Sequence, residues 1–317
     1  AAAQFAQAAF YYPEPSLLSG FVGSDRMWER TPAVGVAQQG MVKERSAAEL
    51  ASVHFGCVRM GVGRHQLAIK LAHEDQGDPA DYEPASFEAE RQFTLAQKSV
   101  SGIAKAISLR AFAGIGLVGT EGLEPVYGLV RSMVLQAAVF HSPKYFQVMV
   151  LTDDPARWDW LKWLPHNQHP DAARADYGGS ARMVWTRLDD LLAAVDIEHG
   201  RGAHSSDPVT PHWLVICDQV RPGPSWDPIT RAQLGGVAGV TFLRLAAERG
   251  EGLEFTARAT HFVTESMITD CDGEPFAVPD FLDEPTARVI ARKMARYSPE
   301  GTVSAAIRVG RALLAST

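Results

Sequence analysis

The sequence predicts an α/β protein built around a largely parallel β-sheet. From about residue 110 onward, short continuous runs of apolar residues alternate with segments of helical pattern. Such runs are typical of strands that are buried on both faces, as in a parallel sheet covered by helices. The chain has 317 residues, 46% of them hydrophobic, which is enough to bury one large core or two of moderate size.

The first third of the chain predicts a helix, a hairpin and further helical segments. Residues 1–12 are alanine-rich and should form a helix that ends before Pro13, because proline restricts the residue before it. Residues 53–72 predict a β-hairpin with its turn near Gly61 to Arg64. Apolar residues at mixed helical spacing predict one or two helices over residues 87–107.

The remainder predicts strands and helices in alternation. The expected strands are 112–119, 146–154, 181–186, 212–218 and 239–246, and the expected helices between them are 125–141 and 188–195. An amphipathic helix over 284–298 follows, whose inner face carries Ala287, Ile290, Ala291 and Met294.

Composition argues against several classes of function. The formal net charge of −7, from 30 basic and 37 acidic residues, provides no basic field, so direct nucleic-acid binding is not expected. Cys57, Cys217 and Cys271 stand apart without a CxxC pair, which argues against a disulfide framework or a zinc site. The longest apolar runs fall short of the roughly 20 residues that a membrane-spanning helix needs. Because the chain starts abruptly and without methionine, we expect it to be part of a longer protein.

A glycine-containing turn lies between the strand 112–119 and the helix that follows it. A phosphate-binding loop of the pattern GxxxxGK[ST] would begin at Gly119, but Glu124, Pro125 and Val126 then stand at the glycine, lysine and hydroxyl positions. Glu124 can itself satisfy the free N–H groups of the first helical turn, and Pro125 suits that turn. The residues alone favour a plain helix entry over a phosphate loop that has lost its chemistry.

Asp218 ends the apolar strand 212–218. An aspartate at the carboxyl end of a central strand suits the positioning of a metal ion, although many aspartates end strands in ordinary turns. Gln219 follows where a general base commonly stands, and an amide cannot accept a proton in that role. The sequence therefore predicts no catalytic residue here.

Three tryptophans lie within six residues directly after the strand 146–154. Trp158, Trp160 and Trp163 can pack locally and hold a loop, or they can form a docking surface for a partner, with His166 beside them. The prolines at 165 and 170 break any helix that would bring His166 into a metal site, and we expect no metal there.

The order of these features resembles the membrane-proximal domain of EccC, the FtsK/SpoIIIE-type motor of type VII (ESX) secretion systems in mycobacteria and related actinobacteria. The resemblance covers about residues 5–300. It rests on "MWER" at 27–30, "YEP" at 82–84, "GLVG" at 116–119, "RSMVLQAAVFHSP" at 131–143, "WDWLKWLPH" at 158–166, "ARMVWT" at 181–186 and "ARVIARKMARYS" at 287–298.

The resemblance implies a RecA/FtsK-like P-loop NTPase fold. It divides the chain into a stalk end and linker over 1–40, a degenerate ATPase domain over 41–300, and a linker over 301–317 toward downstream ATPase modules. It also favours a degenerate nucleotide site over a plain turn, with room for weak binding of ATP and Mg²⁺. That site would comprise Gly119, Thr120, Gly122, Leu123 and Asp218.

The resemblance further implies a place at the cytoplasmic face of the plasma membrane, below membrane helices that precede this sequence. Its partners would be the ubiquitin-like domain of EccD, with EccB and EccE in the same assembly, and Trp158, Trp160, Trp163 and His166 are the interface candidates. Two alternatives stay open. The domain could be a working ATPase whose lysine comes from a neighbouring protomer or from Lys105 or Lys162, or it could translocate DNA, which the acidic balance opposes.

Overall fold

The structure is a computed structural model. It describes residues 2–31, 53–67, 98–169, 181–194, 201–218, 236–248 and 259–297, together with 88–89, 92–93, 175–176 and 179–180. The expected domain boundary at residue 40 and the final linker lie outside the described residues. None of the described helices is long and apolar enough to cross a membrane.

A parallel block of six strands forms the centre of the fold: the five that the sequence predicts and β10, which it does not. Its order along the sheet is β10, β3, β9, β8, β4 and β7. These strands are β3 (Gly114–Gly119), β4 (Phe146–Thr152), β7 (Val184–Trp185), β8 (His212–Asp218), β9 (Val240–Ala246) and β10 (Thr260–Val263). The α/β class and the largely parallel sheet are confirmed.

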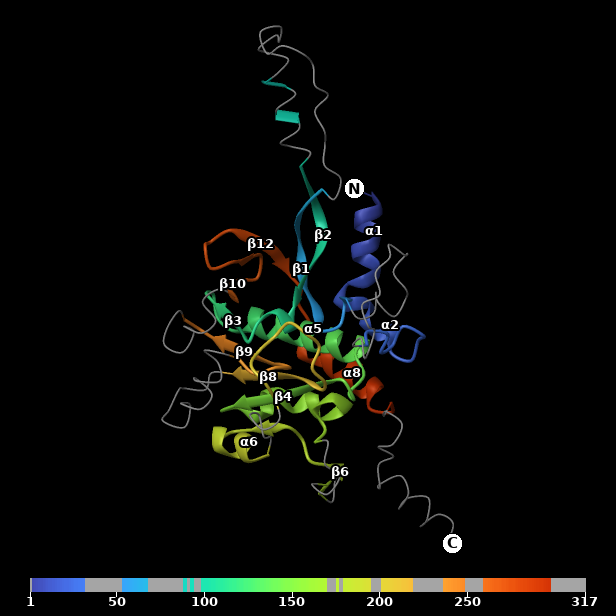
Figure 1. The fold of residues 1–317 in the computed structure, drawn as a ribbon, viewed down its shortest axis with the longest axis vertical. Coiled ribbons are helices and arrows are strands. Elements are labelled where there is room, and N and C mark those ends of the chain that lie inside the picture. Colours follow the sequence, from blue (N-terminus) through green and yellow to red (C-terminus); the bar gives the residue numbers. More distant parts are fainter. Residues whose placement is uncertain are drawn as a thin grey trace.

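Four antiparallel strands extend this block beyond β10, in the order β11, β12, β1 and β2. They are β1 (Cys57–Gln66), β2 (Ser99–Ser108), β11 (Ile268–Thr269) and β12 (Pro275–Pro279). A separate two-stranded sheet pairs β5 (Ala175–Asp176) with β6 (Gly179–Ser180). Figure 1 shows the β1–β2 ladder extending from the main sheet beside α1.

The predicted hairpin over 53–72 is wrong. Residues 57–66 form a single strand, β1, which pairs with β2 on one side and β12 on the other. Gly61 and Gly63 lie within this strand and not in a turn. A Cβ at either position would collide with a backbone carbonyl oxygen of β12, that of Val278 or that of Phe276. The two glycines therefore permit close approach of a neighbouring strand.

The predicted helix over 87–107 is also wrong for its last part. Residues 99–108 form β2, whose buried positions include Ile103 and Ile107. A spacing of four residues fits one face of a strand as well as one face of a helix, so the pattern alone could not separate them. Of the earlier part, 88–89 and 92–93 are helical, and the others lie outside the described residues.

Helices cover both faces of the central strands. α5 (Glu124–Phe140) and α8 (Glu284–Met294) pack with the larger core cluster, and α6 (Leu188–Ala194) packs on the smaller one. Successive residues of β4 alternate between the two clusters: Val148 belongs to the larger and Met149 to the smaller. Both faces of the sheet are therefore buried, which explains the continuous apolar strands.

Several short helical elements lie at the start of the chain and in the connections between strands. α1 (Ala2–Tyr11) ends at the predicted point and is followed by η1 (Pro15–Leu17) and α2 (Leu18–Phe21). The 3-10 segments η3 (Leu109–Ala111), η4 (Pro155–Trp163) and η5 (Pro165–Asn167) lie in the connections. Leu18 and Val22 are buried in the larger core cluster together with α5. The segment after α1 thus packs as part of the core.

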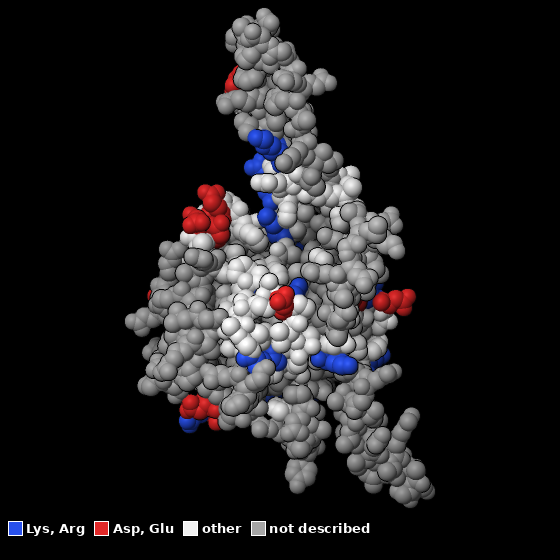
Figure 2. Space-filling view, in the orientation of Figure 1, with Lys and Arg blue, Asp and Glu red and all other residues white. Residues whose placement is uncertain are grey.

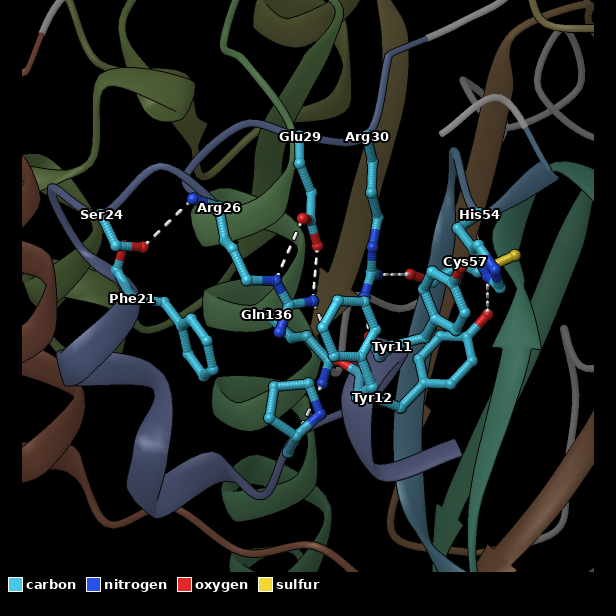
Figure 3. Close-up of polar contacts among 12 residues, drawn as sticks. Tyr11, Tyr12, Phe21, Ser24, Arg26, Glu29, Arg30, His54, Cys57 and Gln136 are labelled. Atoms are coloured by element: carbon cyan, nitrogen blue, oxygen red, sulfur yellow. Dashed lines mark hydrogen bonds and ion pairs between the residues drawn. The ribbon is translucent and has the colours of Figure 1, made fainter. Parts of the chain in front are cut away.

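A polar cluster fastens the end of α1 to β1. We call it the N-terminal joint and define it as Tyr11, Tyr12, Arg30, His54 and Cys57 (Figure 3). The buried Arg30 guanidinium donates to the carbonyl of Cys57 at 2.7 Å and also to the carbonyl of Tyr11. The Tyr12 hydroxyl lies 2.8 Å from Nδ1 of His54, and the Tyr11 ring stacks on the same imidazole. Because Arg30 is buried, the orientation of α1 is held by charge-assisted hydrogen bonds.

The segment that carries Arg30 is also attached to the far end of α5. The backbone N–H groups of Trp28 and Arg30 donate to the carbonyls of Val139 and Phe140, each at 2.9 Å. These carbonyls belong to the last turn of α5, where a helix has no internal donors left for them. The N-terminal segment therefore satisfies the carboxyl end of α5.

Candidate functional site

The glycine turn and Asp218 lie at the same edge of the sheet. β3 ends at Gly119 and β8 ends at Asp218, and β9 lies between them and is parallel to both. The carboxyl ends of parallel strands meet at one edge, which is where open α/β sheets bind ligands. The side chain of Tyr127, in the first turns of α5, spans the distance and contacts Asp218.

The turn itself is compact. Thr120 forms a bridge with Gly122, and a Cβ at Gly119 would collide with the carbonyl oxygen of Gly122. Gly122 has a φ of +108°, a backbone conformation that residues other than glycine rarely adopt. The N–H of Thr120 donates to Val263 on β10 at 3.3 Å. α5 then starts after Leu123, which provides no side-chain cap.

An ion pair occupies the start of α5. Arg131 donates to the Glu124 carboxylate at 2.7 Å and to the carbonyl of Leu282 at 3.3 Å. The Arg131 side chain is almost fully buried, whereas that of Glu124 is largely exposed. The carboxylate that stands at a glycine position of the phosphate-loop pattern is thus paired with a cation two turns further along the same helix.

Asp218 is completely buried and accepts four hydrogen bonds. Oδ1 accepts from the hydroxyl of Tyr127 at 2.9 Å. Oδ2 accepts from Nη1 of Arg157 at 2.9 Å, from Nε1 of Trp158 at 2.9 Å and from the hydroxyl of Thr152 at 3.3 Å. An ionised carboxylate offers about four lone-pair positions, so the protein itself nearly saturates this one. We call Asp218 and these four donors the Asp218 network.

Arg157 is the cation of the network. Its Nη1 also donates to the Tyr127 hydroxyl at 2.7 Å, and its Nη2 lies 3.1 Å from Oδ2 of Asp154. The guanidinium carbon stands 4.5 Å from the centre of the Tyr127 ring. Partial burial lowers the pKa of Arg157, but the hydrogen bond and the charge of Asp218 outweigh that effect and raise it.

The Asp218 network does not fit a magnesium ion as it stands. Mg²⁺ requires oxygen lone pairs at about 2.0–2.1 Å in an octahedral arrangement. Oδ2 of Asp218 instead faces N–H and O–H groups, which present positive hydrogen atoms, and one of them belongs to a guanidinium cation. Within the described residues, no group of three or more His, Cys, Asp or Glu side chains could hold a metal ion.

Sequence reasoning identified part of this site and missed the rest. It named Asp218 and the glycine turn, and it named Trp158 in a separate feature, although the indole N–H of Trp158 contacts Asp218 directly. Tyr127, Thr152 and Arg157 were missed. Thr152 is paired with Asp218 across β4 and β8, a register that the sequence alone does not give. Arg157 lies beside Trp158 in the sequence, but nothing local links it to Asp218.

The other interface candidates differ in burial. Trp160 is 1% exposed and His166 is fully buried, where its Nε2 donates to the carbonyl of His141 at 2.7 Å. Burial lowers the pKa of His166 to about 4, so it is neutral at pH 7. Trp163 is only partly buried, and the guanidinium of Arg292 lies 5.1 Å from its ring centre. Burial favours a packing role for Trp158, Trp160 and His166 and leaves Trp163 accessible to a partner.

Lys105 and Lys162, the candidates to replace the missing lysine of the phosphate loop, make contacts elsewhere. Lys105 lies over the ring of Phe276, 5.0 Å from its centre, on the β1–β2 ladder. Lys162 pairs with Asp159 at 2.8 Å in η4. Neither of these contacts is with a residue of the glycine turn.

The sheet order, the glycine turn that opens α5 and the aspartate at the end of β8 define an α/β protein whose parallel central sheet carries both features at one edge. No protein-family model matches the chain. Among curated proteins, it is 34% identical over 310 residues to the ESX-5 secretion system protein EccC5 of Mycobacterium tuberculosis, a match that covers 91% of this chain. It is 32% identical over 295 residues to the ESX secretion system protein EccC of Thermomonospora curvata, which covers 90% of this chain. The chain belongs to the EccC family of ESX secretion system proteins.

The chain spans about a fifth of the length of these relatives, 20% of EccC5 and 21% of the T. curvata protein. Among solved structures, one match is the cytoplasmic domain of the T. curvata type VII secretion ATPase EccC. It is 14% identical, with a TM-score of 0.46, and the match covers 78% of this chain and 32% of that chain.

Proposed function

We propose that this chain is a module of a type VII secretion motor that couples the membrane pore to the ATPase modules and whose own nucleotide site is degenerate. The observation that carries the proposal is the Asp218 network. The carboxylate that would position a metal ion is fully buried and accepts hydrogen bonds from four side chains of the same domain. A group held in this way has little freedom to serve a nucleotide.

The glycine turn supports the same conclusion. It lacks the lysine and the hydroxyl that contact phosphates and metal, because Pro125 and Val126 stand at their positions. The charge-assisted hydrogen bonds thereby lost are each worth about 1.5–3 kcal/mol. In addition, the Glu124 carboxylate lies in the first turn of α5 and uses the favourable field of the helix N-terminus that phosphate would otherwise use. Any remaining binding of ATP and Mg²⁺ is therefore expected to be weak.

The proposed location is the cytoplasmic face of the plasma membrane, between membrane helices and downstream ATPase modules of the same protein. The proposed partners are the ubiquitin-like domain of EccD, with EccB and EccE in the assembly. On the described part of the face in Figure 2, basic side chains form small separated groups, which agrees with a protein partner better than with nucleic acid.

A titration of labelled ATP against the purified 317-residue chain, with and without Mg²⁺, tests the degenerate site. We expect no saturable binding below millimolar nucleotide, no effect of Mg²⁺, and turnover no faster than that of Asp218→Ala. Tight binding that requires Mg²⁺, with steady-state hydrolysis that Asp218→Ala abolishes, would show that the domain is a working ATPase and would refute the proposal.

A further inference from the structure

Of the four side chains that donate to Asp218, only that of Arg157 carries a charge. We propose that Arg157 is the resident cation of the degenerate site: its guanidinium neutralises Asp218 in place of a divalent metal ion and keeps such an ion out. This inference rests on the proposed degenerate site and concerns how that site is held closed. It predicts a latent metal site that opens when Arg157 is removed.

The guanidinium contacts oxygen atoms of three side chains. Nη1 lies 2.9 Å from Oδ2 of Asp218 and 2.7 Å from the hydroxyl oxygen of Tyr127, and Nη2 lies 3.1 Å from Oδ2 of Asp154. The hydroxyl of Thr152 is in the same network, because it donates to Asp218 at 3.3 Å and accepts from the N–H of Asp154 at 3.0 Å. Carboxylate and hydroxyl oxygens are the ligands that hard divalent cations prefer.

Burial makes a cation at this point obligatory. The Asp218 side chain is 0% exposed, and an ionised carboxylate in that position is strongly unfavourable unless a positive charge is paired with it. Arg157 meets this need from a side chain that is 30% exposed, so the guanidinium stands between Asp218 and solvent. Removal of Arg157 leaves the carboxylates of Asp218 and Asp154 and the hydroxyls of Tyr127 and Thr152 without their cation.

The arrangement also explains why the site does not bind a metal ion in its present form. A divalent cation would have to displace Arg157 from Asp218 and from Asp154 at once, and the two like charges would then lie close together. The tether of the arginine to the chain gives it a high effective concentration at Asp218, against which a free ion competes poorly.

The test uses Mn²⁺ as the probe, with free Mn²⁺ measured by its electron paramagnetic resonance signal. The proteins are the unaltered chain, Arg157→Ala, Arg157→Gln and Arg157→Lys. Arg157→Gln keeps a hydrogen-bond donor and much of the side-chain volume, and it replaces Arg157→Ala if that variant does not fold. Arg157→Lys keeps the positive charge. We expect one Mn²⁺ to bind to Arg157→Ala and Arg157→Gln at least tenfold more tightly than to the unaltered chain. Adding Asp218→Asn to Arg157→Gln should remove this gain, and Arg157→Lys should show none.

Arg26→Ala is the matched control. The Arg26 side chain is 22% exposed, pairs with Glu29 at 2.7 Å and lies 4.0 Å from the ring centre of Phe10. It therefore resembles Arg157 in exposure and in its contacts, but its carboxylate partner is not fully buried as Asp218 is. It should gain no Mn²⁺ site. A folded Arg157→Gln variant whose Mn²⁺ affinity is unchanged would overturn the resident-cation inference and leave the degenerate site standing. An equal gain in Arg26→Ala or Arg157→Lys would overturn it as well. Tight Mn²⁺ binding to the unaltered chain that Asp218→Asn abolishes would instead overturn the proposed function.

Discussion

Truncation of two neighbouring tryptophans separates packing from docking in η4. Trp160 is 1% exposed, and Trp163 in the same short helix is only partly buried. Trp160→Ala should destabilise the domain strongly without any partner present. Trp163→Ala should affect stability much less and should weaken assembly of the secretion complex if this residue contacts a partner.

The magnitudes follow from burial. A buried tryptophan removes about 150–250 Å² from water, which at about 25 cal/mol per Å² corresponds to about 4–6 kcal/mol as an upper value. Truncations of buried aromatic residues cost about 3–5 kcal/mol, and we expect this range for Trp160→Ala. Trp163 is only partly buried, so its truncation loses less area, and with the lost contact to Arg292 we expect a smaller cost of about 1–2 kcal/mol.

The assay is urea unfolding monitored by circular dichroism, followed by affinity purification of the membrane complex from cells that carry each variant. Our reasoning would be refuted by a loss below 1 kcal/mol for Trp160→Ala, or by a loss for Trp163→Ala as large as that for Trp160→Ala. Unchanged complex assembly with Trp163→Ala would remove Trp163 from the interface candidates.

Two further predictions concern buried polar groups. Tyr127→Phe deletes the hydroxyl that joins Asp218 to Arg157. Because buried charged groups then lose a partner, we expect the free energy of unfolding in urea to fall by about 2–3 kcal/mol. The control is Tyr145→Phe, at a partly exposed tyrosine, which should change stability by less than about 0.5 kcal/mol. Burial lowers the pKa of His166 to about 4 and that of His212 to about 3. Since the unfolded histidines take up protons near pH 6.5 and the folded ones do not, stability should fall as the pH drops below about 6.5, by up to about 1.4 kcal/mol per pH unit for each histidine. Urea midpoints at pH 7.5, 6 and 5 measure this, and a flat profile between pH 7 and 5 would contradict it.

Long periodic segments are where the sequence predicts the fold well. α5, β4 and β8 agree with prediction to within two residues, because each is a continuous apolar element that packs in the core. β10, β11 and β12 were not predicted. They are short, of two to five residues, and only pairing with their neighbours in the sheet defines them.

The sequence predicts those parts of the candidate site in which a characteristic residue type stands at the end of a strand. Asp218 meets that description, and so does the glycine turn. Arg157 and Tyr127 could not be found in this way, because they reach Asp218 from 61 and 91 residues away in the sequence. Their role follows from the order of strands in the sheet, which no local pattern encodes. The family resemblance identified the fold, but the partners of Asp218 are a property of this chain's own side chains.

The two ends of α5 serve two different attachments. The N-terminal joint and the segment through Arg30 are fixed to its last turn, while the glycine turn and Tyr127 belong to its first turns. A helix of 17 residues is a stiff rod of about 25 Å. The helix therefore extends from its contacts with the N-terminal segment at one end to the Tyr127 hydroxyl, which contacts Asp218, near the other. The start of the chain and the sheet edge that carries the glycine turn are thus joined through one continuous, buried helix.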